Sequence, residues 1–451
     1  MQLSTLTGDG VDTGSTAWIL TSAAAVLLMV PGLALFYGGM TGTRSILNMI
    51  MMTFGAVAIV GVLWTVVGYS AAFGDSYGGI GLLGNLTEHT GLSSLIAEDP
   101  DAAIPPTLFA VFQALFACIT VALISGALAD RIKFGAWLVF AAAWALLVYF
   151  PVAHWVFAFD SDTAVGGWIA NDLGAIDFAG GTAVHINAGV AALAVVLVLG
   201  RRSNFPNTHK PGNLPLMMLG AGILWFGWFG FNGGSALAAG NAASVVLLNT
   251  FNATCAAMLA WMLVEKLRDG HATTLGAASG AITGLVAITP SCGAVTPVGA
   301  LVLGAVAGLI CPLAVSLKYK LGYDDALDVV GVHMVGGLVG TILIGLLASS
   351  DAPNGQDGLF YGGGIGLLGT QALAAVAVLA YSFVVTLAIA FVLKKTIGLR
   401  VEGHVEASGI DFAVHKELAY DHLDHPVILE VEEPVTDSGE AGGPAKETVD
   451  A

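Results

Sequence analysis

The chain of 451 residues is 56% hydrophobic and only 10% charged, with a mean hydropathy of +0.83 and a formal net charge of −17. This composition excludes an ordinary soluble globular domain. We therefore predict an integral membrane protein that is surrounded by the lipid bilayer, and we expect no nucleic-acid partner.

Apolar runs of about twenty residues recur along nearly the whole chain, and this is the length that an α-helix needs to cross roughly 30 Å of hydrocarbon. The predicted fold class is an all-α membrane protein with eleven transmembrane helices, at 17–38, 46–73, 107–128, 135–157, 177–200, 214–231, 241–264, 272–289, 297–317, 330–349 and 364–393. The first 16 residues carry no basic region ahead of the first span, so we expect no cleaved signal peptide.

The distribution of charge predicts the orientation, because short loops rich in Lys and Arg stay on the cytoplasmic side. With the N-terminus outside and the C-terminus inside, all 15 basic residues fall on the inner side: Arg44, Arg131, Lys133, Arg201, Arg202, Lys210, Lys266, Arg268, Lys318, Lys320, Lys394, Lys395, Arg400, Lys416 and Lys446. The charged residues of the outer segments are instead all acidic: Asp9, Asp12, Asp75, Glu88, Glu98, Asp99, Asp101, Asp160, Asp162, Asp172, Asp351 and Asp357. This acidity either concentrates a cationic solute or reflects a general adaptation to high salt.

Two segments share one pattern, DFAGGTAVHINAG at 177–189 and DALDVVGVHMVGG at 325–337. In each, an Asp precedes a His by eight residues, namely Asp177 and His185, and Asp325 and His333. Five spans separate the two segments, and an odd number reverses direction, so we predict an inverted repeat of spans one to five and six to ten. Each His then lies about 10 Å in from its own face, and the two meet near the bilayer midplane.

Ionisable groups inside a span are costly and face an interior pathway by default. We therefore interpret His185 and His333 as pore residues. Asp177 opens its span, where a carboxylate can accept backbone N–H bonds, so its expected role is structural support.

Aromatic residues indicate a site for a small cation. Phe112 and Phe116 lie one turn apart, and the string WFGWFGFNGGS ends at Ser235. Aromatic faces attract a partly desolvated cation by about 0.5–2 kcal/mol each, and a serine hydroxyl accepts an N–H bond. The four cysteines are not at metal-ligand spacing, and we expect neither a metal nor a cofactor.

These motifs together resemble the ammonium transporters, a family with the Rh proteins as distant relatives. The motifs are DFAGGTAVHINAG, FQALFA, WFGFNGGS, SGAITGLVAITPSCG and DVVGVHMVGG, and the resemblance covers about residues 17 to 420. It implies an eleven-helix subunit, a homotrimer, one pore in each subunit, a multi-pass location in the plasma membrane and a role in nitrogen uptake.

The resemblance also implies roles for individual residues. Phe116 and Phe231 take the positions of a phenylalanine gate, and His185 and His333 those of the twin pore histidines. The external ammonium site falls on Ser235, Phe116, Phe157 and Trp228, with Asp177 as the supporting aspartate.

One position departs from the family pattern. Phe157 stands where the family usually has a tryptophan, which has a stronger π-face, so we predict a lower affinity for ammonium. Trp155, two residues earlier, is expected to point elsewhere.

The predicted domains are a membrane domain at 1–397, a cytoplasmic regulatory region at 398–420 and an acidic, disordered tail at 421–451. The resemblance implies that the regulatory region couples subunits and that PII-type signal proteins are possible partners at the inner face. Lys416 stands where the family often has glycine, so the usual turn there is in question.

The expected activity is capture of ammonium outside, deprotonation beneath the gate and passage of neutral ammonia along the histidines. The sequence leaves open whether the proton follows by a separate path. An ammonium sensor of the same fold, with little transport, is the alternative. An enzyme is not expected, because the chain lacks HExxH, GxSxG and any nucleophile beside a histidine.

Overall fold

The computed structural model of the chain describes residues 10–97, 102–207 and 210–420. Within these ranges the protein is built from helices, with three isolated β-bridges and no extended strand. The predicted tail at 421–451 lies outside the described residues, as do Asp9, Glu98, Asp99, Asp101 and Lys446.

Ten helical segments of the described chain are long and apolar enough to cross a membrane, and they overlap ten of the predicted spans. They are α1 (Thr13–Met40), α2 with α3 (Ile46–Phe73), α4 with its last turn (Pro106–Leu128), α5 with α6 (Phe134–Phe157), a π-helical turn with α7 (Gly181–Leu199), α8 (Leu214–Gly234), α9 (Asn241–Asp269), α11 (Pro297–Leu321), a π-helical turn with α12 (Val330–Leu347) and α13 (Gly366–Thr396). The remaining predicted span corresponds to α10 (Thr274–Ile288), which has 15 residues.

Polar residues mark where the helices begin. Asp12 accepts a bond from the Ser15 N–H at the start of α1 at 2.7 Å, and Asn213 caps α8 in the same way. Thr273 and Thr296 cap α10 and α11. Side-chain acceptors of this kind satisfy N–H groups that have no partner within the helix, which is essential where little water is available.

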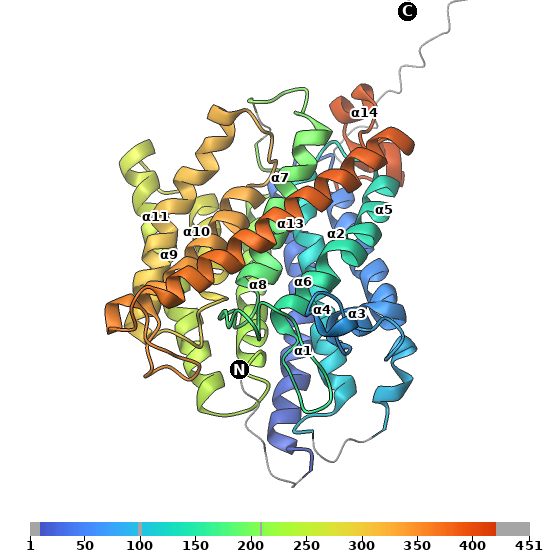
Figure 1. Cartoon of the computed structure of the whole chain (residues 1–451). Helices are drawn as coiled ribbons and strands as arrows, with labels where there is room; N and C mark the ends of the chain where they lie inside the picture. The colour runs from blue at the N-terminus through green and yellow to red at the C-terminus, as the bar shows by residue number, and fades with distance from the viewer. Residues whose placement is uncertain (1–9, 98–101, 208–209, 421–451) are drawn as a thin grey trace, which may run out of the picture.

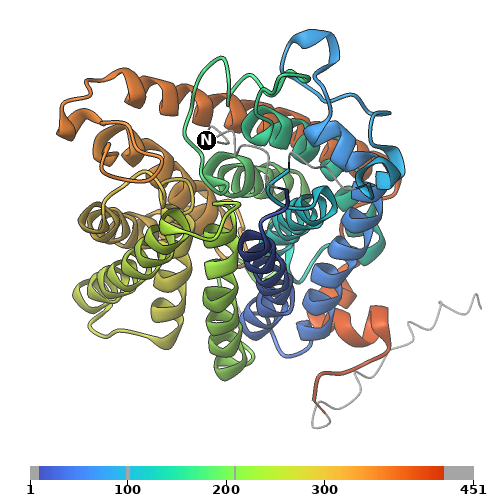
Figure 2. The ribbon, with the colours of Figure 1, turned by 90° about the horizontal axis from the view of Figure 1, so that it is seen from below.

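Small residues allow the helices to pack closely. A Cβ atom at Gly220 of α8 would lie 2.3 Å from the Phe36 nitrogen of α1, and one at Gly304 of α11 would lie 2.2 Å from the Ala253 oxygen of α9. Such contacts are the usual basis of helix association in a membrane. In Figure 2, α1 and α8 lie side by side between α9–α11 on one side and α2–α5 on the other.

The ends of the bundle are distinct. Figure 1 shows α1 beginning at the lower end, whereas the short helix α14 (Gly403–Ser408) lies at the upper end, beyond α13. The long helix α13 crosses the bundle obliquely and packs on α5, α7 and α12. An odd number of crossings is consistent with this separation of the two described ends.

Four π-helical turns interrupt the spans, at Trp64–Gly68, Ala145–Tyr149, Gly181–Ile186 and Val330–Met334. The last two contain His185 and His333. A π-helical turn widens the backbone locally and is frequent at functional sites. Both histidines therefore lie on matching irregular turns, each followed by a regular helix.

Candidate functional site

A cavity of about 460 Å³ opens at the end of the bundle where α1 begins. Three of the residues predicted for an ammonium site line it, namely Phe116 of α4, Phe157 of α6 and Ser235 at the end of α8. Its wall also contains Tyr69, Phe73, Phe109, Phe159 and Phe178. The sequence analysis did not identify these aromatic rings, which come from helix ends and loops far apart in the chain.

Phe116 and Phe231 close the inner end of this cavity. Their ring centroids lie 4.0 Å apart at an interplanar angle of 20°, and both side chains are buried. Phe116 lines the outer cavity, while Phe231 lines a smaller inner cavity of about 10 Å³ together with His185 and His333. The stacked pair thus separates an open aromatic chamber from a narrow apolar passage.

Trp228 lines the inner cavity and not the outer one, where the sequence analysis placed it. Its ring stacks on His185 with centroids 5.5 Å apart, and its Nε1 donates to the Thr289 Oγ1 at 2.8 Å. The physical reason is the helical rise: Trp228 precedes Ser235 by seven residues of α8, which places it about 10 Å deeper in the membrane. Trp155 also avoids the cavity, as predicted, and donates to the Leu82 oxygen at 2.8 Å.

The two histidines meet in the inner passage. The His185 Nδ1 and the His333 Nδ1 are 3.3 Å apart, and the rings lie 5.4 Å between centroids. One Nδ1 must donate while the other accepts, so the pair shares a single proton between the rings. The donor ring then has an accepting Nε2, and the acceptor ring has an N–H at Nε2. The His185 Nε2 is buried and has no hydrogen-bond partner in the described structure.

Each histidine turn begins at an aspartate. Asp177 accepts bonds from the N–H groups of Gly180, Gly181 and Thr182 at 2.8, 2.6 and 2.7 Å, and it also accepts the Thr182 hydroxyl. Asp325 accepts the N–H groups at 329 and 330, at 3.1 and 2.7 Å. A carboxylate at the N-terminus of a helix is stabilised by these donors and by the helix dipole. Their geometry fits the supporting role expected for Asp177.

A third, small cavity lies on the opposite side of His333 from the stacked phenylalanines. Tyr37, Ser279 and Asp328 line it. Asp328 is paired with the buried Lys318, whose Nζ also donates to the Asp325 oxygen at 2.9 Å. This small cavity thus adds a hydroxyl, a phenol and a carboxylate to a lining that is otherwise mostly apolar.

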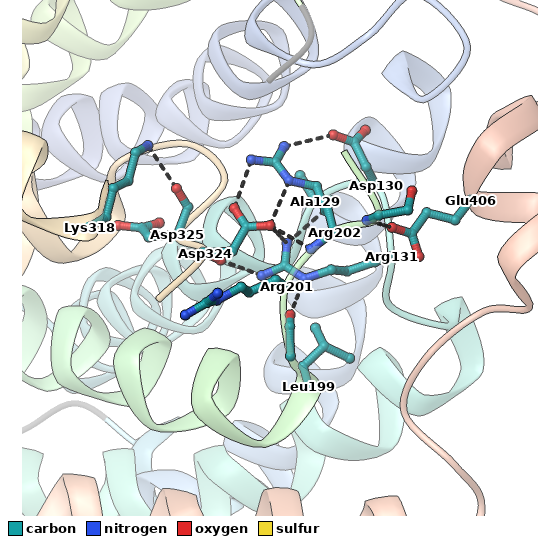
Figure 3. Close-up of polar contacts among 12 residues, drawn as sticks. Ala129, Asp130, Arg131, Leu199, Arg201, Arg202, Lys318, Asp324, Asp325 and Glu406 are labelled. Carbon is teal, nitrogen blue, oxygen red and sulfur yellow. Dashed lines mark hydrogen bonds and ion pairs between the residues drawn. The ribbon is translucent and has the colours of Figure 1, made fainter. Parts of the chain in front are cut away.

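A buried ionic cluster lies beside this inner end (Figure 3). Arg202 contacts Asp324 through Nη2 at 2.8 Å and through Nε at 3.0 Å, and it reaches Asp130 at 3.1 Å. Arg131, fully buried, donates to the backbone oxygens of Ala129, Gly200 and Asp324. Burial raises the pKa of Asp324, but the bonds from Arg202 and the charge of Arg131 outweigh it and hold the pKa below 3.8.

The cluster joins the ends of the two histidine segments. Arg202 follows α7, which carries on from His185, and Asp324 directly precedes Asp325, which caps the turn of His333. The end of one segment therefore lies beside the start of the other, and the two run in opposite directions. The sequence analysis assigned these basic residues only to inner loops and did not predict their pairing.

The segment 398–420 packs against the same end of the bundle. Glu406 accepts the Ser203 N–H at 2.7 Å and pairs with Arg400, and the Val401 N–H donates to the Arg131 oxygen at 3.0 Å. Asp411, fully buried, accepts the N–H groups of Leu47 and Asn48 at 3.0 and 2.8 Å. It thereby caps α2, for which Ser45 makes no side-chain cap.

The turn that contains Lys416 forms despite the missing glycine. Lys416 has φ 60° and ψ 26°, a left-handed conformation that costs a non-glycine residue about 1 kcal/mol or more. Lys416→Gly is therefore expected to raise the stability of this segment by about 1 kcal/mol. Slower hydrogen exchange of the amides at 410–416 in the variant would support this expectation, and faster exchange would contradict it.

Among the described residues, no group of three or more His, Cys, Asp or Glu side chains is arranged to hold a metal ion. The site instead consists of aromatic rings, two imidazoles and hydroxyl groups. These groups suit a small hydrogen-bonding cation and its neutral base.

The family model of the Ammonium Transporter Family matches residues 17–420. The chain belongs to the ammonium transporter family. It is 58% identical over 434 residues to an ammonium transporter of Mycobacterium tuberculosis strain H37Rv, covering 91% of each chain. It is 48% identical over 412 residues to an ammonium transporter of Aquifex aeolicus, covering 91% of this chain and 94% of that protein.

Solved structures agree with this assignment. The crystal structure of Saccharomyces cerevisiae Mep2 is similar with a TM-score of 0.79 at 34% identity, covering 88% of this chain and 89% of that one. A structure described as a sensor Amt protein is similar with a TM-score of 0.81 at 28% identity, covering 89% and 98%. Membership of the ammonium transporter family and ten apolar helices in the described chain identify a multi-pass plasma-membrane protein.

Proposed function

We propose that the protein takes up ammonium from outside, removes its proton at the stacked phenylalanines and conducts ammonia past the two histidines. The observation that carries this proposal is the order of the cavities. An aromatic chamber of about 460 Å³ is followed by the closed pair Phe116 and Phe231, then by a passage of about 10 Å³ that contains His185.

The outer chamber suits ammonium. Phe116 and Phe157 offer π-faces, and Ser235 offers a hydroxyl oxygen. The Ser235 hydroxyl donates to the Phe231 oxygen at 2.8 Å, so its lone pairs remain able to accept an N–H bond from the ion. Asp177, which also lines this chamber, adds a negative potential.

The inner passage suits ammonia and excludes its ion. An unpaired cation in a dry apolar channel costs far more than two cation–π contacts return. The His185 and His333 pair, in contrast, presents one accepting and one donating Nε2, which matches the lone pair and N–H groups of ammonia. The same imidazoles can pass a proton along a separate route.

We further propose the topology and assembly that the sequence predicts. Eleven crossings, with α10 as the short eighth, would put the two ends on opposite sides, and the basic loops favour the N-terminus outside and the segment 398–420 inside, with residues up to 397 as the membrane domain. The matched turns of His185 and His333 support an inverted repeat. We propose a homotrimer, a regulatory role for 398–420 and a PII-type protein as its partner.

The alternative is an ammonium sensor of this fold. The similarity to a structure described as a sensor Amt protein supports this alternative. Both functions need the outer chamber. They differ in whether the inner passage conducts at a useful rate.

The test is a current measurement on proteoliposomes that contain the purified full chain and receive an ammonium jump. A sustained charge movement supports transport with a proton and excludes simple gas conduction. Alkalinisation of the lumen without charge movement supports ammonia conduction alone. Binding of ammonium with no flux above empty liposomes would favour the sensor.

Phe157→Trp is expected to tighten the apparent affinity for ammonium by about tenfold or less. A Trp face attracts a cation more strongly than a Phe face, and the difference is on the order of 1 kcal/mol at a partly desolvated site. Half-saturation of the proteoliposome current measures this affinity. Phe159→Trp, at an exposed ring of the same wall, is the matched control, and an equal shift in both variants would contradict a specific role for Phe157.

A further inference from the structure

The long helix α13 lies outside the predicted repeat but is bonded directly to the segment that carries His185. Gln371 of α13 is fully buried. Its Nε2 donates to the Ile176 oxygen at 2.7 Å, and its Oε1 accepts the Ile176 N–H at 2.7 Å. One side-chain amide thus satisfies both backbone groups of a single residue. The opposite orientation of the amide would place two donors and two acceptors face to face, so the pairing fixes the orientation.

Gln371 also reaches the second histidine segment, because its Nε2 lies 3.4 Å from the Thr341 oxygen of α12. A buried amide that loses such partners is costly, since each unsatisfied backbone group costs about 1–3 kcal/mol. The contacts therefore restrain both partners.

The residue that Gln371 holds is next to the aspartate that caps the turn. Ile176 directly precedes Asp177, and both line the outer cavity. The flanking amides are bonded elsewhere, that of Ala175 to the Ile169 oxygen and that of Phe178 to the Pro290 oxygen, both at 3.0 Å. Gln371 thus supplies both backbone hydrogen bonds of Ile176, the residue directly before Asp177.

Two further side chains of α13 continue the same pattern. The Ser382 hydroxyl donates to the Asn187 oxygen at 3.1 Å, and the Lys394 Nζ donates to the Val198 oxygen at 2.7 Å. The sequence separations of these bonds are 195 for Gln371, 195 for Ser382 and 196 for Lys394. A constant separation means that α13 and the His185 segment run in the same direction. Figure 1 shows α13 crossing in front of α7. All three bonds reach backbone atoms, so they fix the position of the segment along α13.

We propose that Gln371 is a positioning residue for transport. Through Ile176 it sets the position of Asp177, and therefore of the π-helical turn that carries His185, relative to the outer cavity. It touches neither the ion nor the passage, and it acts only through these residues. The transport readout of this proposal rests on the proposed function, whereas its structural readout does not.

The experiment compares Gln371→Met with the matched control Thr386→Val in the full-length protein. Thr386 is also fully buried on α13, but its hydroxyl accepts the Trp144 Nε1–H of α5 at 2.9 Å, so this bond goes to α5 and not to a histidine segment. Gln371→Met removes two bonds to Ile176 at nearly unchanged volume. The half-saturating ammonium concentration of the proteoliposome current is expected to rise about threefold or more in Gln371→Met and to stay unchanged in Thr386→Val.

A double-mutant comparison with Asp177→Asn separates positioning from general loosening. If Gln371 acts through Asp177, then Gln371→Met is expected to change the half-saturating concentration little once Asp177→Asn is present. Independent, multiplying effects of the two substitutions would overturn the proposal. If the methionine variant does not fold, Gln371→Asn takes its place: it keeps the neutral amide but withdraws it by one methylene, and it must still raise that concentration.

Hydrogen exchange tests the same inference without transport. The amides of Ile176 and of residues 180–183 are expected to exchange about tenfold faster in Gln371→Met than in the wild type, and at unchanged rates in Thr386→Val. If the wild type shows neither a current nor alkalinisation of the lumen, the proposed function fails, and exchange alone decides the role of Gln371. Equal exchange in Gln371→Met and Thr386→Val would overturn that role, whether or not the protein transports.

Discussion

Replacing His185 by aspartate is expected to lower ammonium flux by about 100-fold or more. The side chain is buried, and it faces Trp228, Phe231 and His333 in a passage of about 10 Å³. A carboxylate at this point would pair with ammonium instead of accepting neutral ammonia. Separating an ion pair in a dry interior costs several kcal/mol, which slows release of the ion. The measurement is the initial rate in proteoliposomes, at equal amounts of reconstituted protein.

His185→Gln is the control for this prediction. Glutamine is neutral and both donates and accepts, so it is expected to retain more flux than aspartate. An aspartate variant that transports as fast as the wild type would mean that the passage accepts a full positive charge. It would then contradict the proposal that ammonia crosses as the neutral base.

Replacing Arg202 by methionine is expected to destabilise the protein by about 3–5 kcal/mol. Arg202 contributes three contacts to the buried carboxylates of Asp324 and Asp130, and its loss leaves Asp324 with the Arg131 guanidinium at 4.0 Å as the nearest positive charge. Removing one partner of a buried pair costs this much because the other charge remains in a poorly solvated place. Thermal unfolding of the purified protein in detergent measures the loss.

Two further variants test the reason. Arg202→Met combined with Asp324→Leu is expected to recover part of the stability, because the fully buried carboxylate of Asp324 is then removed together with its main partner. Arg268→Met is the matched surface control. Arg268 and Asp269 form an ion pair with both side chains 42% exposed, so this variant is expected to cost less than about 1 kcal/mol. Equal losses in Arg202→Met and Arg268→Met would show that burial is not the cause.

The apolar runs predicted the helices well because length and hydrophobicity are local properties. The histidine span was nevertheless predicted to begin at residue 177, whereas the helix begins at Gly181. Asp177 and the three residues after it form the cap, and hydropathy cannot distinguish a cap from a first turn. The π-helical turn of His185 also gives no signal in the sequence, because widening of the backbone depends on what packs around it.

Repetition made the centre of the site predictable. The shared spacing of Asp and His predicted that His185 and His333 meet, and their Nδ1 atoms are 3.3 Å apart. A motif string gives the order of residues but not their depth, which is why Trp228 was placed at the outer cavity. The helical rise of about 1.5 Å per residue would have corrected this placement. The pairing of Arg202 with Asp324 spans 122 residues and could not be read from local pattern.

Asp411 provides the N-cap of α2 from the other end of the chain. Docking of the C-terminal segment and order in the first turn of α2 are therefore thermodynamically linked, and linkage is reciprocal. A ligand that binds only the undocked segment must loosen the start of α2, at a cost of about 0.5–2 kcal/mol for a lost cap. By the same factor, any event inside the membrane that orders the first turn of α2 lowers the affinity of that ligand for the segment. The cap thus links the state of a transmembrane helix to the affinity of any ligand that binds the undocked segment.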